Sequence, residues 1–378
     1  MDVTAADPDT VLDALDRRLV CALQVDGRAG AGRIAEVLGV SGRTVTRRLT
    51  RLQQTGLVRV VRMPDAEDAA VGALLLRIRV LGGRADTVAQ ALAERPDVPF
   101  VDVMLGGREI GAVMLSEAGA RDRLLHGQLP ATTAVAETTV HAVLHAFADA
   151  GQWRSGHLTE AEAAALAGPP VERPAPGSVP LDALDRTLLA RLGEDARQSH
   201  AMLAAAVGTP ESTVRRRLHR LDGAGLVRTH VTVDPRLLGF AVDANLWLDV
   251  PPGRLAAVGA ALARHPRVHG VLATSGPANL MAAVFCRDHG GLYRFVTDTL
   301  GPLGVARAET TIVARAVKRA GVVLRRPGAG GAPPPPPRGR GAPGGPAPPP
   351  PPPRGCGARG VTPGTGDVRG GRVTSGEA

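Results

Sequence analysis

The sequence contains few aromatic residues and few cysteines, and it has no long apolar segment. Aromatic residues make up 2% of the chain, which disfavours a single-stranded nucleic-acid surface, where bases stack on aromatic rings. The three scattered cysteines include no C-x-x-C pair, which disfavours a zinc ribbon or a disulfide framework. No run approaches the ~20 apolar residues of a membrane span, and the polar start MDVTAADPDT does not resemble a signal peptide. We expect a cytoplasmic protein with no membrane partner, no metal and no cofactor.

The formal net charge of +9 is unevenly distributed along the chain. From Val322 onward, eight arginines stand against Asp367 and Glu377, so this tail carries +6 of the total. The remainder of the chain is only mildly basic, and nearly all its cations are arginines. A high isoelectric point is therefore weak evidence for DNA binding, and the local placement of the arginines has to decide the question.

The chain contains an internal repeat. Residues 12–59 align without gaps to residues 181–228, at an offset of 169 residues, and about half of the positions are identical. The copies share the start LDALDR, a T-V-x-R-R-L core and the end G-L-V-R. A chance match of this length is not credible, so we predict two copies of one folding unit.

Each copy begins with a pattern typical of helices. Leucines spaced three to four residues apart, starting at Leu12 and Leu181, indicate a first amphipathic helix. A short second helix is expected to end at Gly39 or Gly208, because glycine readily adopts the positive φ of a sharp turn.

A third helix is expected to follow in each copy. It starts after Ser41 in the first copy, while in the second copy Thr209 is the expected cap and Pro210 the first helical residue. After Gly56 the first copy continues into LVRVVR, which predicts a strand leading out of the helical unit.

A longer segment with mixed strand and helix patterns follows each helical unit. The expected elements are 74–81, 86–94, 98–105, 110–115, 118–126 and 134–144 in the first copy, and 242–250, 254–264, 268–274, 280–285, 292–300 and 305–317 in the second. The order β-α-β-β-α-β is that of the ferredoxin-like fold, so the fold class is α+β. Thr159 and Glu162 predict a capping box for a short helix between the copies.

These patterns divide the chain into six segments. Helix-turn-helix domains are expected at 11–63 and 181–232, and ferredoxin-like domains at 70–148 and 233–320. Between the copies, 149–180 should form a short helix and a stiff Pro-rich linker. The Gly/Pro/Arg tail, 321–378, should be disordered, because it cannot bury enough apolar surface to offset the entropy of ordering.

The third helix of each copy has an apolar face and an opposite face rich in arginine. Val45 and Leu49, with Val214 and Leu218 in the second copy, point inward, and the 100° helical step places cationic and short polar residues outward. No acidic residue lies between Val37 and Pro64, a stretch with six arginines. Such a face predicts a helix that enters the major groove of double-stranded DNA, where arginine pairs with guanine. The expected DNA-binding residues are Arg43, Thr44, Arg47, Arg48, Thr50 and Arg51 in the first copy and Ser212, Thr213, Arg215, Arg216, His219 and Arg220 in the second.

With these motifs the sequence resembles the Lrp/AsnC (feast/famine) family of bacterial regulators. The matching features are L-D-x-x-D, the segment T-V-x-R-R-L-x-R-L and the closing G-L-V. In the second copy, 233–235 and 238–240 resemble the hinge of the family, which MPDAEDAAVG replaces in the first copy. The resemblance covers Leu12 to Ala320. It implies a sequence-specific transcriptional regulator with two winged-type helix-turn-helix domains, each followed by a ferredoxin-like βαββαβ (RAM) domain that dimerises through its sheet.

The resemblance also implies a small-molecule effector, an amino acid or a related metabolite. Its site would lie near a G-x-x-D turn between the second and third strands of the ferredoxin-like domain. An ammonium group prefers a carboxylate partner, so an asparagine at the acidic position of the second copy weakens this expectation, and a plain glycine hairpin is the alternative. The expected effector-binding residues are Gly106, Glu109, Ser275, Gly276 and Asn279.

Family members usually carry one unit per chain, whereas this chain carries two. The chain should therefore form a homo-oligomer or pair its own halves as an internal pseudo-dimer. A pseudo-dimer would present two unlike recognition helices to an asymmetric operator, with half-sites about one turn (~34–36 Å) or a multiple apart.

Two alternative functions remain open. Proteins that resemble this family act as sirohaem decarboxylases, for which His126, His141 and His145 would be candidate residues. His141 and His145 also have a spacing that can bind a metal on a helix, but no third ligand is apparent. The other alternative is an architectural DNA binder with little sequence preference. The arginine-rich helix face, for which an enzyme has no use, favours a regulator that is not an enzyme.

Overall fold

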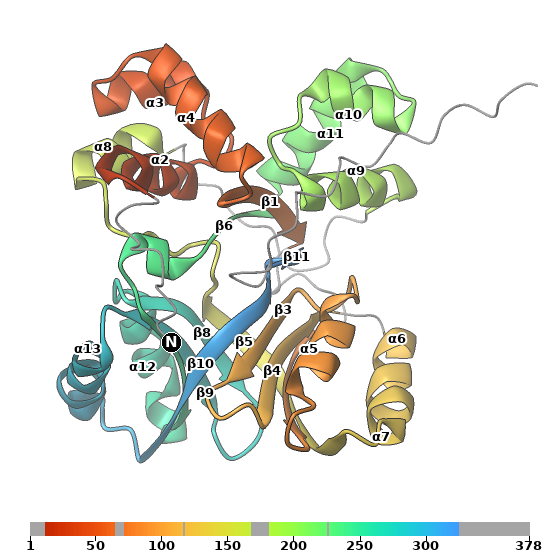
Figure 1. Ribbon diagram of the computed structural model, residues 1–378, viewed down its shortest axis with the longest axis vertical. Helices are drawn as coiled ribbons and strands as arrows, with labels where there is room; N and C mark the ends of the chain where they lie inside the picture. Colours follow the sequence, from red (N-terminus) through yellow and green to blue (C-terminus); the bar gives the residue numbers. More distant parts are fainter. Residues whose placement is uncertain (1–11, 65–71, 116–117, 168–180, 225–226, 325–378) are drawn as a thin grey trace, which may run out of the picture. The chain divides into compact units, whose positions relative to one another are not determined.

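The protein is described by a computed structural model that covers residues 12–64, 72–115, 118–167, 181–224 and 227–324 (Figure 1). The predicted Pro-rich linker, 168–180, and nearly all of the predicted tail lie outside the described residues. Within the described ranges, no helix combines the length and the apolar character needed to cross a membrane.

Two helical units of the same design are present. The first contains α2 (Ala14–Val25), α3 (Ala31–Leu38) and α4 (Gly42–Gln54), and the second contains α9 (Ala183–Glu194), α10 (His200–Val207) and α11 (Glu211–Gly223). Capping boxes begin α2 and α9. The predicted glycine turns are present, because Gly39 and Gly208 have φ of 68° and 64°. Each unit packs its apolar helix faces around its own core.

The start of α11 differs from the prediction by one residue. Thr209 is not the cap; Pro210 is the N-cap, it makes no side-chain hydrogen bond, and the helix begins at Glu211. The aligned position in the first copy is Ser41, whose hydroxyl accepts a hydrogen bond from the backbone N–H of Thr44 as predicted. Proline has no side-chain acceptor, so the second helix lacks this stabilising contact.

The strands that leave the two helical units pair with each other. β1 (Val58–Pro64) and β6 (Val227–Val233) run antiparallel, and the central pair of the ladder is Val61 with His230. These two residues occupy aligned positions in the repeat. The two copies are therefore related by an approximate two-fold axis through this pair, which is the symmetry of an isologous dimer interface.

Two aligned arginines join the helical units reciprocally. Arg28 donates to the backbone oxygen of Ala196 at 2.5 Å, and Arg197 donates to the oxygens of Gly27 at 2.8 Å and Ala29 at 3.2 Å. Burial lowers the pKa of both guanidinium groups, although nearby aspartates partly offset this effect. Each half thus supplies a cation that satisfies the backbone carbonyls of the other.

The order β-α-β-β-α-β follows each helical unit, as predicted. The first half has β2 (Ala73–Val80), α5 (Ala85–Ala93), β3 (Phe100–Met104), β4 (Glu109–Leu115), α6 (Ala118–Asp122), a π-helical turn (Arg123–Gln128), α7 (Leu129–Ala131) and β5 (Val135–Ala148). The second half has β7 (Val242–Asp249), α12 (Leu255–Ala263), β8 (Val268–Thr274), β9 (Leu280–Cys286), α13 (His289–Arg294), a π-helical turn (Phe295–Leu300) and β10 (Arg307–Arg319), with short 3₁₀ turns at 235–238, 252–254 and 301–303.

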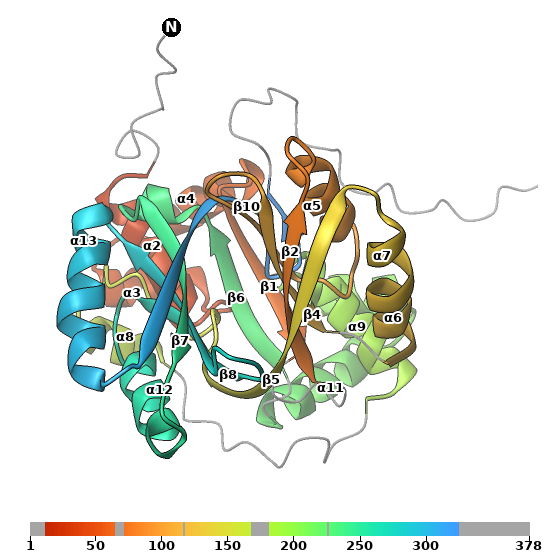
Figure 2. The ribbon, with the colours of Figure 1, turned by 90° about the horizontal axis from the view of Figure 1, so that it is seen from below.

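In the described part of the chain, eight antiparallel strands form a closed ring. β10 pairs with both β3 and β7, and β5 pairs with β8, which gives the cyclic order β10-β3-β4-β2-β5-β8-β9-β7. Alternate residues face opposite sides: Leu76 and Ile78 pack outward in the core that includes α5, while Leu75 points inward with Trp247 and Met281. The helices of the two halves lie on the outside of the strands (Figure 2).

The first four residues of the predicted tail belong to the described fold. Residues 321–324 are ordered, and β11 (Val322–Val323) pairs with the end of β10. Ala320 and Gly321 have φ of 46° and 78°, so they form the two-residue turn of this hairpin. The prediction of disorder from residue 321 was wrong at these positions, because two β-branched residues after a turn can extend the hairpin.

The segment between the copies is more than a spacer. Its helix α8 (Glu160–Leu166) begins with the predicted Thr159–Glu162 capping box. Glu162 pairs with Arg18 of α2 at 2.5 Å, and Leu166 is fully buried in the core of the first helical unit. The segment therefore contributes to the first helical unit directly.

The reciprocal arginines predict a measurable contribution to stability. Arg28→Ala should lower the free energy of unfolding by about 1–3 kcal/mol, because it leaves backbone carbonyls of the other half without a donor. Arg59→Ala, at an exposed position of β1, should change it by less than ~0.5 kcal/mol. Urea denaturation of both variants would measure the difference, and equal effects would contradict the assigned role of Arg28.

Candidate DNA interface and effector turns

The recognition helices expose the face that the sequence predicted. In α4, Val45, Leu49 and Leu52 are buried, and in α11 Val214, Leu218 and Leu221 are buried. The residues of the predicted DNA-binding set that are exposed are Arg43, Arg47, Thr50 and Arg51 in α4 and Ser212, Arg215, Arg216, His219 and Arg220 in α11. Thr44, Arg48 and Thr213 are half-buried. Both helices therefore carry cationic side chains on the side that faces away from their own cores.

Some of these arginines already have partners in the protein. Arg48 lies 2.5 Å from Asp13 and 3.0 Å from Asp16, and Arg51 lies 2.5 Å from Asp16. Asp16 is buried, and its carboxylate therefore holds α4 against α2 through two guanidinium groups. The hydrogen bonds that Arg48 donates to Asp13 and Asp16 raise its pKa.

The second helical unit repeats this arrangement. Arg217 lies 2.6 Å from Asp182 and 3.0 Å from Asp185, and Arg220 pairs with the buried Asp185. The backbone N–H of Asp185, with Arg217, lowers the pKa of Asp182 to about 2. This carboxylate is therefore ionised at neutral pH, and its contribution to stability would be lost as the pH falls from about 4 toward 2.

The ion pairs distinguish two groups among six of the seven predicted DNA-binding arginines. Arg48, Arg51 and Arg220 position the recognition helix, a role that sequence reasoning missed. The available signal was the L-D-x-x-D motif, whose second aspartate lies 32 and 35 residues before two of these arginines. Arg43, Arg47 and Arg216 form no ion pair with any of the described residues.

The two recognition helices differ in charge. In α11, Glu211 pairs with Arg215 at 3.1 Å, and Asp222 pairs with Arg62 of β1. Burial lowers the pKa of Arg62 to about 10, and the positive charge of Arg28 acts in the same direction. The helix α4 has no acidic residue, so the two heads present unlike surfaces.

In the first predicted effector turn, the carboxylate of Glu109 forms an ion pair within the chain. Gly106, at the start of this turn, has φ of 102°. Glu109 lies 2.9 Å from Arg77, which also pairs with Glu309 at 2.6 Å and lies over the ring of Trp247. Burial acts to lower the pKa of Arg77, but the two glutamates outweigh it and raise the pKa. Glu109 therefore already has a cationic partner within the chain.

The second predicted turn is packed against the first half. Ser275 exchanges hydrogen bonds with Ala142 of β5 at 2.8 and 2.9 Å. Asn279 donates to the oxygen of Val250 at 2.7 Å and accepts from its N–H at 3.0 Å. Gly276 has φ of 99°, and a Cβ atom there would lie 2.7 Å from Nδ1 of His141. The Asn279 amide thus closes the end of β7.

The histidines of the enzyme alternative have structural contacts. His141 is buried, lies 2.8 Å from the oxygen of Ser275 and packs against Trp247, while His145 packs edge-on against Phe147. His126 lies in the π-helical turn after α6. The described residues contain no group of three or more His, Cys, Asp or Glu side chains placed to hold a metal ion.

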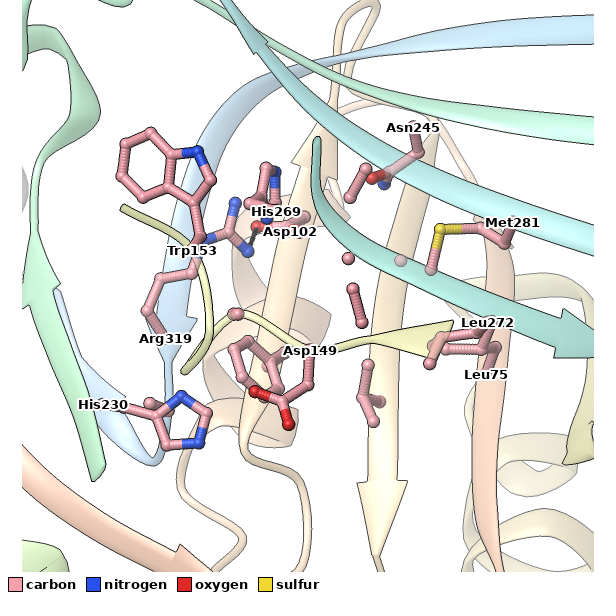
Figure 3. A pocket seen from close by; sticks show the side chains of 18 of the residues that line it. Leu75, Asp102, Asp149, Trp153, His230, Asn245, His269, Leu272, Met281 and Arg319 are labelled. Atoms are coloured by element: carbon pink, nitrogen blue, oxygen red, sulfur yellow. Dashed lines mark ion pairs between the residues drawn. The ribbon is translucent and has the colours of Figure 1, made fainter. Parts of the chain in front are cut away.

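A cavity of about 210 Å³ lies inside the strand ring and extends to the β1–β6 ribbon. Its wall is mainly apolar, with Leu75, Leu272 and Met281 on one side and Arg319 and His230 on the other (Figure 3). The sequence alone did not indicate this cavity, because its lining residues come from strands of both halves and from β6.

Two helix-turn-helix units with outward-facing cationic helices define a DNA-binding protein of the helix-turn-helix class. The model of the AsnC-type helix-turn-helix domain matches residues 12–53 and 181–222, and that of the Lrp/AsnC ligand binding domain matches residues 244–323. An uncharacterised HTH-type transcriptional regulator of Pyrococcus abyssi is 31% identical over 144 residues, which cover 38% of this chain and 91% of that protein. The regulator LrpA of Pyrococcus horikoshii is 26% identical over 140 residues, which cover 36% of this chain and 99% of that protein.

The chain belongs to the Lrp/AsnC family, and it is a DNA-binding transcriptional regulator with a small-molecule-binding domain. Among solved structures, the siroheme decarboxylase NirDL aligns with a TM-score of 0.50 at 14% identity, over 75% of this chain and 85% of that chain. This similarity concerns the fold, and it extends over both halves of the chain.

The unpaired arginines predict a loss of DNA affinity without a loss of stability. Arg47→Ala or Arg216→Ala should weaken binding to a selected operator by about 1–3 kcal/mol if each residue contacts a base. Arg79→Ala, at a highly exposed site on β2, is the matched control. Fluorescence anisotropy would measure affinity and urea denaturation stability. Wild-type affinity in both variants would remove these residues from the interface.

Proposed function

We propose that the chain acts as an internal pseudo-dimer that recognises an asymmetric operator with two unlike heads. The approximate two-fold axis through Val61 and His230 carries this proposal, because it relates two recognition helices within one polypeptide. The reciprocal contacts of Arg28 and Arg197 support it. Each head would place the start of its recognition helix in the major groove, with Arg43 and Arg47, or Arg216, directed to the DNA.

The proposed domain division follows the repeat. Residues 11–63 and 181–232 would be winged-type helix-turn-helix domains, and 70–148 and 233–320 ferredoxin-like domains. Residues 149–180 would join the halves, with α8 as part of the first DNA-binding unit. Because it contacts chromosomal DNA, we expect the protein to act in the cytoplasm.

We also propose that the chain responds to a small-molecule effector. The family association supports a small-molecule effector, such as an amino acid. Glu109 pairs with Arg77, and Asn279 is bonded to Val250, so an effector at either turn would have to compete with contacts inside the chain.

The volume of the cavity and the exposed arginines favour a regulator over a tetrapyrrole enzyme. The cavity of about 210 Å³ is smaller than the ~300–1,000 Å³ of sites that hold drug-sized ligands, and a tetrapyrrole macrocycle exceeds this lower limit. The exposed arginines of α4 and α11 also have a role in a regulator and none in such an enzyme. Titration of the purified protein with a tetrapyrrole should therefore produce no new Soret band, and a saturable band would favour the enzyme.

An asymmetric operator is testable with head-specific variants. Arg47→Ala should weaken protection of one half-site and Arg216→Ala protection of the other, since each arginine belongs to a different head. Footprinting of the wild type and both variants on one operator fragment would show this. Symmetric weakening of both half-sites by a single variant would indicate a dimer of chains, each using one head. A specific-to-non-specific affinity ratio near unity would instead indicate an architectural binder, whereas ~10³ or more is expected of a regulator.

A further inference from the structure

The strand ring encloses a site with a charge arrangement that the proposed function does not use. Arg319 at the end of β10 lies 2.5 Å from Asp102 of β3 and 2.6 Å from Asp243 of β7, so one guanidinium group serves two carboxylates from different halves. His269 of β8 lies 3.4 Å from Asp243. The two carboxylates and the one guanidinium group together carry a net charge of −1. A buried negative charge without a counter-charge is unfavourable, so the site would be stabilised by one additional cation.

Of the two carboxylates, Asp102 is the one most affected by the excess negative charge. It is 9% exposed, and its Oδ1 atom is held by Arg319, a guanidinium group that it shares with Asp243. Burial raises the pKa of Asp102 and the neighbouring Asp243 adds to this effect, while Arg319 only partly offsets them. Burial also acts on Asp243, but Arg319 and His269 outweigh it and lower its pKa. The excess charge is therefore borne by Asp102, which lines the cavity.

The rest of the cavity is suited to an apolar body. Leu75, Trp247, Met281 and Ala283 form an inward-facing apolar cluster, and Phe285 also lines the cavity. A ring of eight strands has room inside either for its own side chains or for one small ligand. An apolar cavity of ~150 Å³ is enough to bind benzene, so about 210 Å³ accommodates one aromatic ring with a short side chain.

The two carboxylates of this group have apolar equivalents across the two-fold axis. When the strands are matched by the residues that face inward, Asp102 corresponds to Leu272 and Asp243 to Ala73. Each carboxylate therefore has an apolar residue at the equivalent position of the other half. Packing of two similar sheets does not require such a difference, whereas a ligand with one polar end and one apolar end fits it.

We propose that this cavity binds a small arylalkyl amine, whose ammonium group donates to Asp102 and whose ring lies among Trp247, Met281 and Phe285. The site is separate from the two glycine turns, and a carboxylate ligand is disfavoured by the excess negative charge. Charge-assisted hydrogen bonds are roughly twice as strong as neutral ones, so the ammonium group should distinguish this ligand from a neutral analogue.

The cavity also touches the DNA-binding part of the chain. His230 of β6 lines it, and β6 begins four residues after the end of α11. A bound amine would therefore occupy a cavity that the strand following the second recognition helix also lines. This regulatory consequence rests on the proposed function, whereas binding in the cavity does not depend on it and is measured without DNA.

The test uses three ligands of similar shape with the full-length protein. These are 2-phenylethylamine, neutral 2-phenylethanol and anionic phenylacetate. The two tryptophans of the chain, Trp153 and Trp247, both line the cavity, so their fluorescence should respond to occupancy. We expect 2-phenylethylamine to bind about tenfold or more tightly than 2-phenylethanol by calorimetry, and phenylacetate to bind more weakly than either. No response to any of the three, or tighter binding of phenylacetate, would overturn the proposal.

Two variants separate the charge from the cavity. Asp102→Asn keeps the side-chain volume and should reduce 2-phenylethylamine binding to the level of 2-phenylethanol. Ala283→Leu should fill the cavity and weaken both ligands. Glu137→Gln, which removes an exposed carboxylate on β5, is the control and should leave binding unchanged. Wild-type amine binding by Asp102→Asn would exclude this carboxylate as the partner, even if Ala283→Leu fails to fold.

The pH dependence has a defined direction. The pKa of Asp102 is raised to about 6, mainly by burial. Its ionised form is needed to bind the ammonium group, so affinity should be constant above about pH 7 and fall as the pH drops below 6. His269 faces the same group through Asp243, from which it lies 3.4 Å away. Affinity that does not change between pH 5 and 8 would contradict the proposed ion pair.

Anisotropy with operator DNA, with and without 2-phenylethylamine, distinguishes failure of this proposal from failure of the regulator assignment. Specific DNA binding without amine binding would refute the cavity proposal alone. Amine binding without specific DNA binding would support the cavity and refute the proposed function.

Discussion

The structure depends on the antiparallel pairing of β1 with β6 about the Val61–His230 pair. This ladder brings the two copies of the repeat into a two-fold relationship, and the contacts of Arg28 and Arg197 follow from it because aligned residues meet on opposite sides of the axis. β10 then completes the arrangement, since it pairs with a strand from each half. A single chain thereby contains the interface that separate subunits would otherwise have to form at the expense of association entropy.

Covalent linkage of the halves allows them to diverge. In a homodimer, any substitution appears on both sides of the axis, whereas here each half can change alone. The recognition helices illustrate this: α11 carries Glu211 and Asp222, and α4 carries no acidic residue. The same freedom allows Asp102 and Asp243 to lie in one group with Arg319, while Leu272 and Ala73 occupy the positions equivalent to the two carboxylates.

The arginines of the recognition helices serve two purposes that a sequence pattern does not separate. Arg48 and Arg217 occupy aligned positions and bind the aspartates that cap the first helix of their units. The recognition helix is held in place by the same ion pairs that neutralise the buried Asp16 and Asp185. Arg43, Arg47 and Arg216 face solvent, and their charge is available to a phosphate or a guanine.

The sequence by itself determined the repeat, the helix faces and the order of strands. Local rules suffice for these features: apolar periodicity selected Val45 and Leu49 as buried residues, and the positive φ of Gly39 and Gly208 follows from the lack of a side chain. The prediction of the α11 cap was wrong. Proline stands there in place of the serine of the first copy, and it is the N-cap although it cannot accept a hydrogen bond through its side chain. Local rules also failed at Val322 and Val323, where a two-residue turn extends the last hairpin into a segment of disorder-prone composition.

Only the tertiary structure decided which half contacts which, and what lies between the halves. Asp102, Asp243, His269 and Arg319 come from four strands that are distant in sequence, and no spacing rule predicts that they share one buried group. The closed ring brings them together because β10 pairs with both β3 and β7. Residue types that are common on protein surfaces are buried there, and their negative charges exceed their positive charges by one. Strand register across a two-fold axis is a long-range property, which is why the local pattern predicted both sheets but not the cavity inside them.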